Sequence, residues 1–235
     1  MNKLLKLFRI LRFIFHDIYF NFRYLPCKQA IHLPILLYSP HFESCRGKII
    51  IKSKSVHFGM IQLGFPNNHS NLDGIIIYNS GGILEFVGDG TFFIGSSSVL
   101  SVGKKGYLSF EKNISASQSH FLCDYRMIFH ENCTIGSRCT FMDCDFHAIK
   151  NIVTGEKKLP YKLVEIGSNN WFGFECMIMK GTSTSDNIIV GSRSLLNKNY
   201  QNSTYSILAG SPAKIIKKGY YRDFDDQIFN INKYE

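Results

Sequence analysis

A period of six residues runs through the C-terminal half of this 235-residue chain, with apolar residues at five of six successive positions. The run is Ile166, Phe172, Ile178, Thr184, Val190 and Leu196, and a glycine directly follows three of these residues, at Gly167, Gly173 and Gly191. Helices and flat strands have other periods, about 3.6 and 2 residues. Three short strands joined by tight turns form a triangular coil of about 18 residues, which places the same position inside at every level. The period therefore predicts stacked three-sided coils with ladders of apolar side chains inside.

Shorter registers of the same period extend the pattern toward the N-terminus. They are Phe129, Ile135 and Phe141; Val102, Leu108 and Ile114; and the pair Ile94-Gly95. We expect the small residues after the ladder positions to supply the permissive backbone angles that tight turns need. An ordinary sheet protein with scattered Ile-Gly pairs does not explain an unbroken run of six positions. The chain is therefore expected to be mainly β, with coils over residues 46–215 and a tail over 216–235.

Cations recur every three residues near the N-terminus, at Lys3, Lys6, Arg9 and Arg12. Apolar residues between them keep the spacing of one helical face: Leu4, Leu7, Phe8, Leu11, Ile14, Phe15 and Ile18. This predicts an amphipathic basic helix within residues 3–20. Charged residues interrupt the apolar run that a membrane span or a signal peptide needs. Two interpretations stay open: the helix lies in the headgroup layer of an anionic membrane, or it packs on its own domain or on a neighbouring subunit.

Three prolines follow this helix, at Pro26, Pro34 and Pro40. Because proline disrupts the interior of a helix, residues 26–45 are expected to form an extended connector, which makes residues 1–45 a segment separate from the coil. Stacked coils cannot bury their two ends by themselves. The basic helix and the Lys-rich tail are therefore candidates for end caps.

The composition excludes several classes of protein. Hydrophobic residues make up 45% of the chain and charged residues 19%, which is typical of a globular domain and not of a disordered one. The net charge is +9, but no nucleic-acid-binding signature accompanies it, so we expect no nucleic-acid partner. The seven cysteines include no CxxC pair. This argues against a zinc ribbon or a disulfide framework and indicates reduced thiols in the cytoplasm.

The C-terminal motifs resemble those of the hexapeptide-repeat acyltransferases. They are Ile166-Gly-Ser-Asn-Asn-Trp-Phe-Gly173, Val190-Gly-Ser-Arg-Ser-Leu-Leu-Asn-Lys198 and Ile207-Leu-Ala-Gly-Ser-Pro-Ala-Lys214. Upstream, Phe141-Met-Asp-Cys-Asp-Phe-His147 is similar to the segment that carries the catalytic histidine in O-acetyltransferases of bacterial surface polysaccharides. The pairs Thr184-Ser185 and Met179-Lys180 depart from the family pattern and are expected to soften one rung of the ladder.

The resemblance implies a left-handed parallel β-helix with the N-terminal helix and a short C-terminal helix. It also implies a homotrimer that uses acetyl-CoA as co-substrate, with no metal. The implied activity is O-acetylation of a sugar hydroxyl on a surface polysaccharide or its lipid-linked precursor. Such an enzyme would act in the cytoplasm, where the basic helix places it at the inner face of the membrane.

His147 is the candidate general base. Acyl transfer from a thioester to a hydroxyl needs a group that takes the hydroxyl proton, and imidazole titrates in the right range. A carboxylate bonded to the far ring nitrogen would fix its tautomer, and both Asp145 and Asp143 share strand parity with His147. The choice between them stays open. Cys144 is a less favoured nucleophile, because Cys133, Cys139 and Cys144 suit small coil positions.

The resemblance also assigns residues to the cofactor. Those expected to line the pantetheine arm are Trp171, Gly173, Phe174 and Ser192, and those expected to meet the nucleotide end are Asn197, Lys198, Lys214 and Lys217. Cations suit that end because it carries the phosphates.

Residues 148–163 break the six-residue register directly after the candidate base. We interpret them as a loop thrown out of the coil, able to fold over the groove of a neighbouring subunit and exclude water from it. Since the family's site forms between subunits, the expected assembly is a homotrimer with shared sites.

Three other functions compete with this interpretation. A zinc enzyme on the same coil would need stacked histidines, but His120, His130 and His147 are 10 and 17 residues apart, which are not multiples of six. A noncatalytic β-helix scaffold would not release CoA thiol. An N-acetyltransferase of an amino sugar would share the chemistry, and no residue of this sequence distinguishes it from an O-acetyltransferase.

Overall fold

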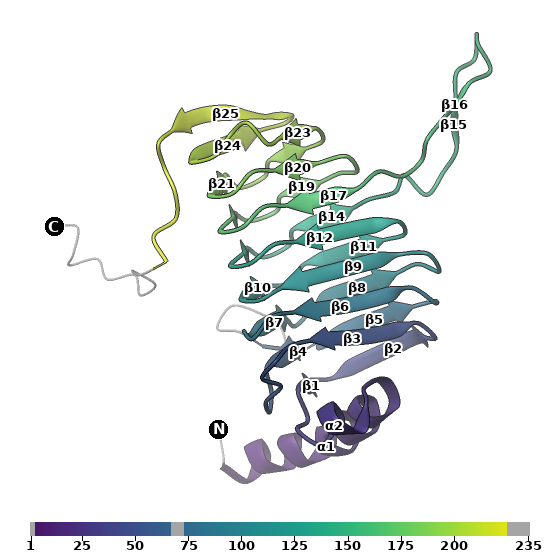
Figure 1. The fold of residues 1–235 in the computed structure, drawn as a ribbon, viewed down its shortest axis with the longest axis vertical. Helices are drawn as coiled ribbons and strands as arrows, with labels where there is room; N and C mark the ends of the chain where they lie inside the picture. The colour runs from purple at the N-terminus through teal and green to yellow at the C-terminus, as the bar shows by residue number, and fades with distance from the viewer. Residues whose placement is uncertain (1–2, 67–72, 225–235) are drawn as a thin grey trace, which may run out of the picture.

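The computed structural model of the protein describes the backbone of residues 3–66 and 73–224, and the side chains from residue 14 onward within these ranges. Two helices, α1 (Lys3–Tyr24) and α2 (Cys27–Ala30), precede a stack of short strands in this part of the chain. The chain visits three parallel sheets in turn, so each circuit adds one coil to the stack (Figure 1). This confirms the predicted left-handed β-helix and its N-terminal helix.

We name the three sheets A, B and C in the order in which each coil visits them. Sheet A contains β1 (Ile35–Leu37), β4 (Ile61–Phe65), β7 (Phe92–Gly95), β10 (Ile114–Ala116), β13 (Thr134–Ile135), β18 (Trp171–Phe172), β21 (Ile188–Val190), β24 (Ser206–Gly210) and β25 (Ala213–Lys218). Sheet B contains β2 (Pro40–Cys45), β5 (Ile75–Asn79), β8 (Ser98–Val102), β11 (His120–Cys123), β14 (Thr140–Met142), β19 (Met177–Ile178) and β22 (Leu195–Leu196). Sheet C contains β3 (Lys48–Lys52), β6 (Ile83–Val87), β9 (Tyr107–Glu111), β12 (Arg126–Phe129), β17 (Val164–Ile166), β20 (Ser183–Thr184) and β23 (Asn199–Tyr200).

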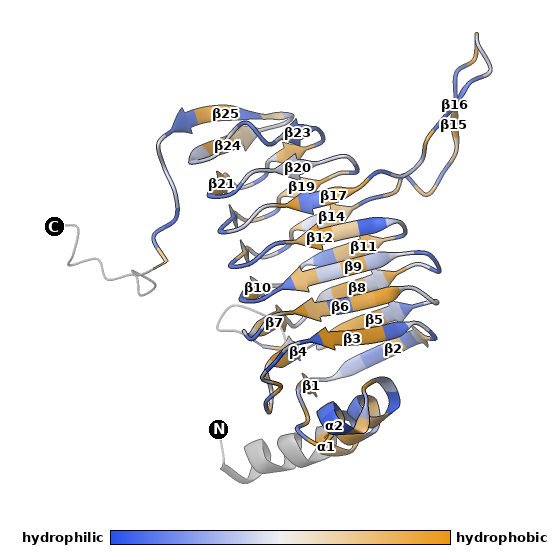
Figure 2. Ribbon diagram, in the orientation of Figure 1, coloured by the Kyte–Doolittle hydropathy of each residue, from blue (hydrophilic) through white to orange (hydrophobic). Residues whose placement is uncertain are grey.

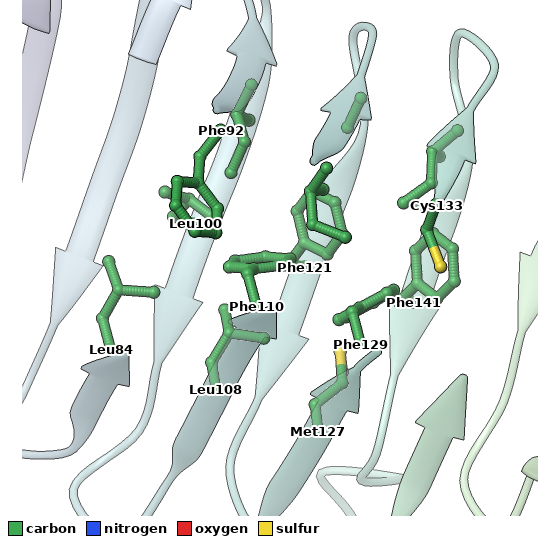
Figure 3. Packing of buried hydrophobic residues seen from close by; sticks show 14 of the residues in the cluster. Leu84, Phe92, Leu100, Leu108, Phe110, Phe121, Met127, Phe129, Cys133 and Phe141 are labelled. Atoms are coloured by element: carbon green, nitrogen blue, oxygen red, sulfur yellow. The ribbon is translucent and has the colours of Figure 1, made fainter. Parts of the chain in front are cut away.

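The core is the set of ladders that the six-residue period predicts. All six residues of the run from Ile166 to Leu196 are buried. Further down the stack the ladder is aromatic, and the Phe129 ring lies 5.0 Å from Phe110 and 4.9 Å from Phe141 between ring centroids (Figure 3). Strands β3 and β6 are correspondingly hydrophobic in Figure 2. Each buried side chain of this size contributes roughly 1.5–3 kcal/mol, so the stack is stabilised along its whole length.

Thr184 is the polar rung of the ladder. Its Oγ1 accepts hydrogen bonds from the Gly167 backbone N–H at 3.0 Å and from Asn170 Nδ2 at 2.7 Å. Asn170 Oδ1 in turn accepts the Ile188 N–H at 2.7 Å. These bonds satisfy the buried polar atoms, so Thr184 links neighbouring coils rather than softening the rung.

The glycines after the ladder positions serve close packing and not unusual backbone angles, so that expectation is wrong. A Cβ atom on Gly167 would lie 2.6 Å from the Ser185 carbonyl, and the φ of this glycine lies outside the left-handed region. The left-handed residues stand three positions after the ladder residues, at Asn169 and Arg193, both with φ of 59°. Coil stacking therefore excludes a side chain at the glycine, while the turn itself is made by a larger residue.

The first coil begins at Ile35, eleven residues before the predicted boundary at residue 46. Strand β1 pairs in parallel with β4, and β2 with β5. The prolines do not prevent this, because β1 and β2 are edge strands and Pro40 is the first residue of β2. Proline lacks an N–H but is tolerated at such positions. Residues 35–45 are therefore coil and not connector.

Helix α1 caps the N-terminal end of the coil, as predicted. Asn21 pairs with the edge residue Ile35 like a neighbouring strand, donating from Nδ2 to its carbonyl at 2.7 Å and accepting its N–H on Oδ1 at 3.1 Å. Asp17 Oδ1 accepts the Leu37 N–H at 2.8 Å, and the Tyr24 hydroxyl donates to the Cys45 carbonyl at 2.6 Å. The helix thus satisfies backbone groups that an edge strand would leave unpaired.

The other end is closed by an antiparallel strand pair. Strand β25 folds back on β24, the last parallel strand of sheet A. The short C-terminal helix that the resemblance implies is absent through residue 224, where the described chain ends, and residues 225–235 lie outside it. Residues 213–218 are in a strand because they cover the edge of sheet A, which a helix there would leave unpaired.

Candidate active site

His147 lies where the chain leaves the coil, at the corner between sheets B and C. Strand β14 of sheet B ends at Met142, and the coil resumes at Val164 in β17 of sheet C. Between them the chain projects as an antiparallel pair, β15 (Ile149–Lys150) and β16 (Lys157–Lys158), which Figure 1 shows extending far from the stack. The last strand before this projection thus ends at Met142, ahead of the predicted loop over residues 148–163. His147 is exposed at its root, and its imidazole is not part of the core.

A kink directly precedes the candidate base. Phe146 has a φ of 60°, which is rare for a bulky residue and costs about 1–2 kcal/mol. Its N–H donates to the Cys144 sulfur at 3.3 Å. The kink turns the chain out of the coil one residue before His147. Conformations of this kind are retained where the surrounding structure holds them.

Main-chain contacts hold the two sides of the hairpin root together. The Asp145 N–H donates to the Pro160 carbonyl at 2.8 Å, and the Lys162 N–H donates to the Asp143 carbonyl at 3.0 Å. Between them, Cys144 and Tyr161 form an antiparallel bridge. His147 is thus two residues beyond a fixed point of the backbone.

Asp145 is paired with Lys180, which belongs to the same corner one coil further on. Lys180 Nζ lies 2.6 Å from Asp145 Oδ2 and donates to the Leu159 carbonyl at 2.8 Å. Both side chains are mostly buried, with 20% of the Asp145 and 11% of the Lys180 surface exposed. Charged hydrogen bonds with little exposure to water are stronger than those on the surface. Lys180 therefore fixes the hairpin root, a role that its departure from the family pattern did not reveal.

Asp143 is a structural residue. Its side chain is fully buried, Oδ1 accepts the Asp124 N–H at 2.9 Å, and Oδ2 accepts the Tyr125 N–H at 3.0 Å. Both carboxylate oxygens therefore bind backbone N–H groups of the preceding coil. Of the two carboxylates predicted to orient His147, the structure leaves Asp145 as the one beside the hairpin root.

The cysteines of the coil are packing residues. Cys133 and Cys139 are fully buried, as predicted, and burial raises the pKa of Cys133 to about 12. A thiol with such a pKa stays protonated and is a poor nucleophile. Cys144 is partly exposed at the hairpin root, where its sulfur accepts the backbone hydrogen bond from Phe146.

The predicted cofactor residues fall into two sets on different sides of the coil. Those on sheet A and on the corner between sheets A and B are Trp171, Gly173, Phe174, Ser192, Lys214 and Lys217. Those on the corner between sheets B and C are Asn197 and Lys198. The second set stands on the same corner as Lys180 and the hairpin root, one coil beyond Lys180.

The first set forms a continuous outer surface. Trp171 is 40% exposed and is aligned across the strands with Ile189, Ile207 and Lys217. At the neighbouring corner, Ser192 Oγ accepts the Phe174 N–H at 3.1 Å. The guanidinium of Arg222, which no sequence motif indicated, lies 5.8 Å from the Trp171 ring centroid. An aromatic face, exposed apolar groups and cations are thus available to a long ligand with an anionic end.

Lys198 and Lys214 are brought together although they belong to different sets. They line one groove of about 550 Å³ at the C-terminal end of the stack, together with Tyr200 and Ser203. The Tyr200 hydroxyl donates to the Ala213 carbonyl at 3.3 Å, which joins the two walls. Two lysines in one groove form a suitable site for phosphate groups.

His147 and Trp171 lie on opposite sides of one chain. In a three-sided coil each corner faces away from one sheet, and the corner between sheets B and C faces away from sheet A. Trp171 is on sheet A, so the body of the coil separates it from the root of the hairpin. Within one chain, the candidate base and the surface around Trp171 are therefore on different sides of the coil.

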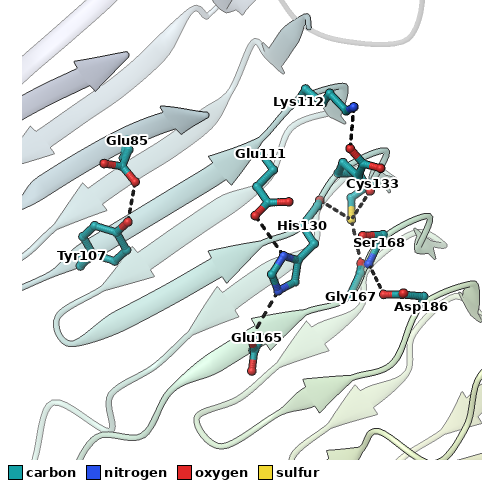
Figure 4. A network of polar contacts seen from close by, with 11 residues as sticks. Glu85, Tyr107, Glu111, Lys112, His130, Cys133, Glu165, Gly167, Ser168 and Asp186 are labelled. Atoms are coloured by element: carbon teal, nitrogen blue, oxygen red, sulfur yellow. Dashed lines mark hydrogen bonds and ion pairs between the residues drawn. The ribbon is translucent and has the colours of Figure 1, made fainter. Parts of the chain in front are cut away.

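Other described histidines bear on the zinc alternative. No group of three or more His, Cys, Asp or Glu residues in the described part of the chain is arranged to hold a metal ion. His130 instead bridges two carboxylates on sheet C, with Glu111 at 3.1 Å and Glu165 at 3.3 Å (Figure 4). Burial lowers the pKa of His130, but hydrogen bonds and charge attraction from Glu165 and Glu111 outweigh it and raise the pKa overall.

Solved structures share this architecture. The polysialic acid O-acetyltransferase OatWY aligns over 80% of this chain and 96% of its own, with a TM-score of 0.54 and 20% sequence identity. A point mutant of AntD, an N-acyltransferase from Bacillus cereus crystallised with dTDP-4-amino-4,6-dideoxyglucose and coenzyme A, aligns over 80% of this chain and 90% of its own, with a TM-score of 0.52 and 14% identity. This is the fold of the hexapeptide-repeat acyltransferases.

Sequence relatives match shorter stretches. A chloramphenicol acetyltransferase of Morganella morganii is 49% identical over 53 residues, which are 23% of this chain and 24% of that protein. One of Agrobacterium fabrum is 38% identical over 68 residues, which are 29% of this chain and 30% of that protein. These alignments thus span less than a third of the relatives' length. No protein-family model matches the sequence.

Proposed function

We propose that this protein is an acetyl-CoA-dependent O-acetyltransferase that acts on a sugar hydroxyl of a surface polysaccharide or its lipid-linked precursor. The observation that carries the proposal is the exposed His147 at the kinked root of a hairpin, held by the Asp145–Lys180 pair. The acyltransferase fold and the polysialic acid O-acetyltransferase neighbour support the reaction class. The phosphate groove at Lys198 and Lys214 supports the co-substrate.

The proposed reaction is a direct transfer. The His147 imidazole takes the proton from the acceptor hydroxyl while that oxygen attacks the thioester carbon. A backbone N–H stabilises the oxyanion of the tetrahedral intermediate. The carbon–sulfur bond then breaks, and the imidazolium returns its proton to the departing CoA thiolate. The products are an acetyl ester and free CoA, and Asp145 acts by keeping the hairpin root in place.

We further propose that the working unit is a homotrimer with sites between subunits. His147 of one copy would then meet the surface around Trp171 on sheet A of the next copy. This arrangement would bring the two together although they lie on different sides of one chain. The projecting hairpin would cover the neighbour's groove and exclude water. Closed rotational symmetry gives every copy both roles, so each trimer would hold three equivalent sites.

Replacing the candidate base tests the reaction. With acetyl-CoA and an oligosaccharide acceptor, His147→Ala is expected to lower kcat about 100- to 10,000-fold, measured as release of CoA thiol. Trimer mass by light scattering and acetyl-CoA binding by calorimetry should be unchanged. His57→Ala is the matched control, since His57 is an exposed histidine in a coil far from the hairpin. Full activity of His147→Ala would refute the assignment.

Mixing inactive variants tests the shared site. His147→Ala and Trp171→Ala alter opposite sides of the chain, so a mixed trimer contains some sites in which both residues are intact. Co-refolding the two variants should restore part of the activity, whereas each variant alone stays low. No recovery in trimers shown to be mixed would exclude a site that takes His147 and Trp171 from different copies.

N-acylation is the second candidate, favoured by the structural likeness to the N-acyltransferase AntD. Product chemistry separates the two, because an acetyl ester is cleaved by mild base and an amide is not. Chloramphenicol should be included as an acceptor, given the short matches to its acetyltransferases. A scaffold without activity would release no thiol with any acceptor.

A further inference from the structure

The described side chains of α1 separate into two faces, and the face turned toward the coil is partly polar. Asp17 and Asn21 are buried there, bound to the backbone of Ile35 and Leu37. Phe20 completes this face and stacks on Phe42 with ring centroids 5.4 Å apart. The helix is therefore attached to its own domain mainly by residues other than those of its predicted apolar face.

The opposite face of α1 is apolar and uncovered. Phe15 is 77% exposed and Tyr19 68% exposed, and the same face continues through Ile18 and Phe22. In the sequence, the spacing of this face extends toward the N-terminus through Leu11, Phe8 and Leu4. An amphipathic helix normally buries its apolar stripe against the core. Here the helix packs on its own coil through the opposite face, and the described part of the apolar face is left uncovered.

The charge of the helix indicates which partner. Its 22 residues contain five cations, Lys3, Lys6, Arg9, Arg12 and Arg23, and one carboxylate. That carboxylate is Asp17, which faces the coil and is buried. A second copy of the same face would bring like charges together, whereas an anionic surface would neutralise them. A helix rich in both apolar residues and cations has the composition of helices that lie in a bilayer interface.

The position of the helix leaves this face accessible. Helix α1 lies across the N-terminal end of the stack and not along its side (Figure 1), while the exposed candidate base lies on a side corner much further along. Contact at the end would therefore not cover the hairpin root or the surface around Trp171. No helix in the described residues is long and apolar enough to cross a membrane.

We infer that α1 docks the protein on an anionic lipid bilayer, with the uncovered face from Phe15 to Phe22 in the headgroup layer. The coil then stands away from the surface, and the site faces the space beside it. If the protein is the trimer proposed above, three helices lie at the same end of the assembly and bind together, which strengthens the attachment. Docking through α1 requires neither that trimer nor the reaction.

Vesicle sedimentation with the full chain tests the inference. The protein should sediment with vesicles of phosphatidylcholine mixed with phosphatidylglycerol and much less with phosphatidylcholine alone. Phe15→Ser and Phe22→Ser should each lower the partition coefficient about tenfold, because each removes one aromatic side chain from the interface. Replacing Lys3, Lys6, Arg9 and Arg12 by Gln should remove the preference for anionic vesicles.

Phe58→Ser is the matched control, since Phe58 is 67% exposed but lies in a loop outside the helix. It should bind vesicles like the unmodified chain, and circular dichroism should show equal folding of all variants. Absence of binding to the anionic vesicles would overturn the inference, as would equal binding of Phe15→Ser. Formation of larger oligomers that Phe15→Ser abolishes would overturn it too, in favour of a second copy. Acyl transfer to a soluble acceptor should be unchanged by Phe15→Ser, so this test and that of the proposed reaction fail independently.

Discussion

The interior of the coil and the corner between sheets B and C follow different rules. In the interior, one apolar position repeats at every level, and neighbours such as Phe129 and Phe141 are separated by two six-residue steps along the chain. At the corner, the repeat is broken after Met142, and buried or half-buried charges replace apolar contacts. The regular part thus supplies a rigid support, whereas the chemistry is placed where the chain departs from it.

Breaking the interior should have the largest effect on stability. Phe129→Ala removes a ring that contacts Phe110, Phe121 and Phe141. The rigid stack cannot collapse around the gap, so we expect a loss of about 3–5 kcal/mol in the free energy of unfolding, measured by urea denaturation. Phe58→Ala, at an exposed position, should change it by less than about 0.5 kcal/mol. A small effect at Phe129 would mean that the ladder is not the source of stability.

The two aspartates of the corner should separate stability from activity. Asp143→Ala removes a buried carboxylate and leaves the partly buried N–H groups of Asp124 and Tyr125 without their acceptors, so it should destabilise the fold by about 2 kcal/mol. Asp145→Asn removes the charge beside Lys180 and should mainly lower kcat. Melting temperature and thiol release, measured on both variants, test the contrast. If Asp143→Ala is stable but inactive, Asp143 and not Asp145 would be the carboxylate that orients His147.

Removing Lys180 should have a smaller, mainly catalytic effect. Lys180→Met loses the bonds to Asp145 and Leu159 that hold the hairpin root, so kcat should fall about tenfold with little change in the KM for acetyl-CoA. Lys180→Arg keeps the charge and should recover part of the rate. Lys162→Met is the control, because that side chain is exposed on the same hairpin root. Equal rates in Lys180→Met and Lys162→Met would show that the pair does not position the base.

The sequence predicts the regular coil better than the corner between sheets B and C. Ile166 to Leu196 share one period, so the ladder and the coil could be predicted from spacing alone. The projecting hairpin was visible for the same reason, as a loss of register after His147, although the strand itself ends at Met142. The Asp145–Lys180 pair was not, because it joins residues 35 positions apart that no period relates. The sequence did not reveal the first coil, because its strands contain Pro40 and lack an Ile-Gly pair. An edge strand tolerates the proline and does not need the glycine.

Asp17 of the cap helix α1 should have the smallest effect on the free energy of unfolding, and this effect should depend on pH. Burial raises the pKa of Asp17 to about 6, against which the hydrogen bond from Leu37 acts only in part. The folded state therefore binds this proton more tightly than the unfolded state, whose aspartate titrates near 3.8. The contribution of Asp17 to stability is thus most favourable below about pH 4, falls as the pH rises toward about 6, and stays low above it.

Asp17→Asn keeps an acceptor for the Leu37 N–H but carries no charge, so it should remove this dependence. Above about pH 6 the variant should be more stable than the unmodified chain by about 1 kcal/mol, after allowance for partial solvent screening, and the difference should shrink toward pH 4. Urea denaturation at both ends of this range measures it. If the variant is less stable at neutral pH, the charged carboxylate itself stabilises the cap. The end of the coil would then resemble the corner between sheets B and C, where charged groups hold the chain, and not the apolar interior.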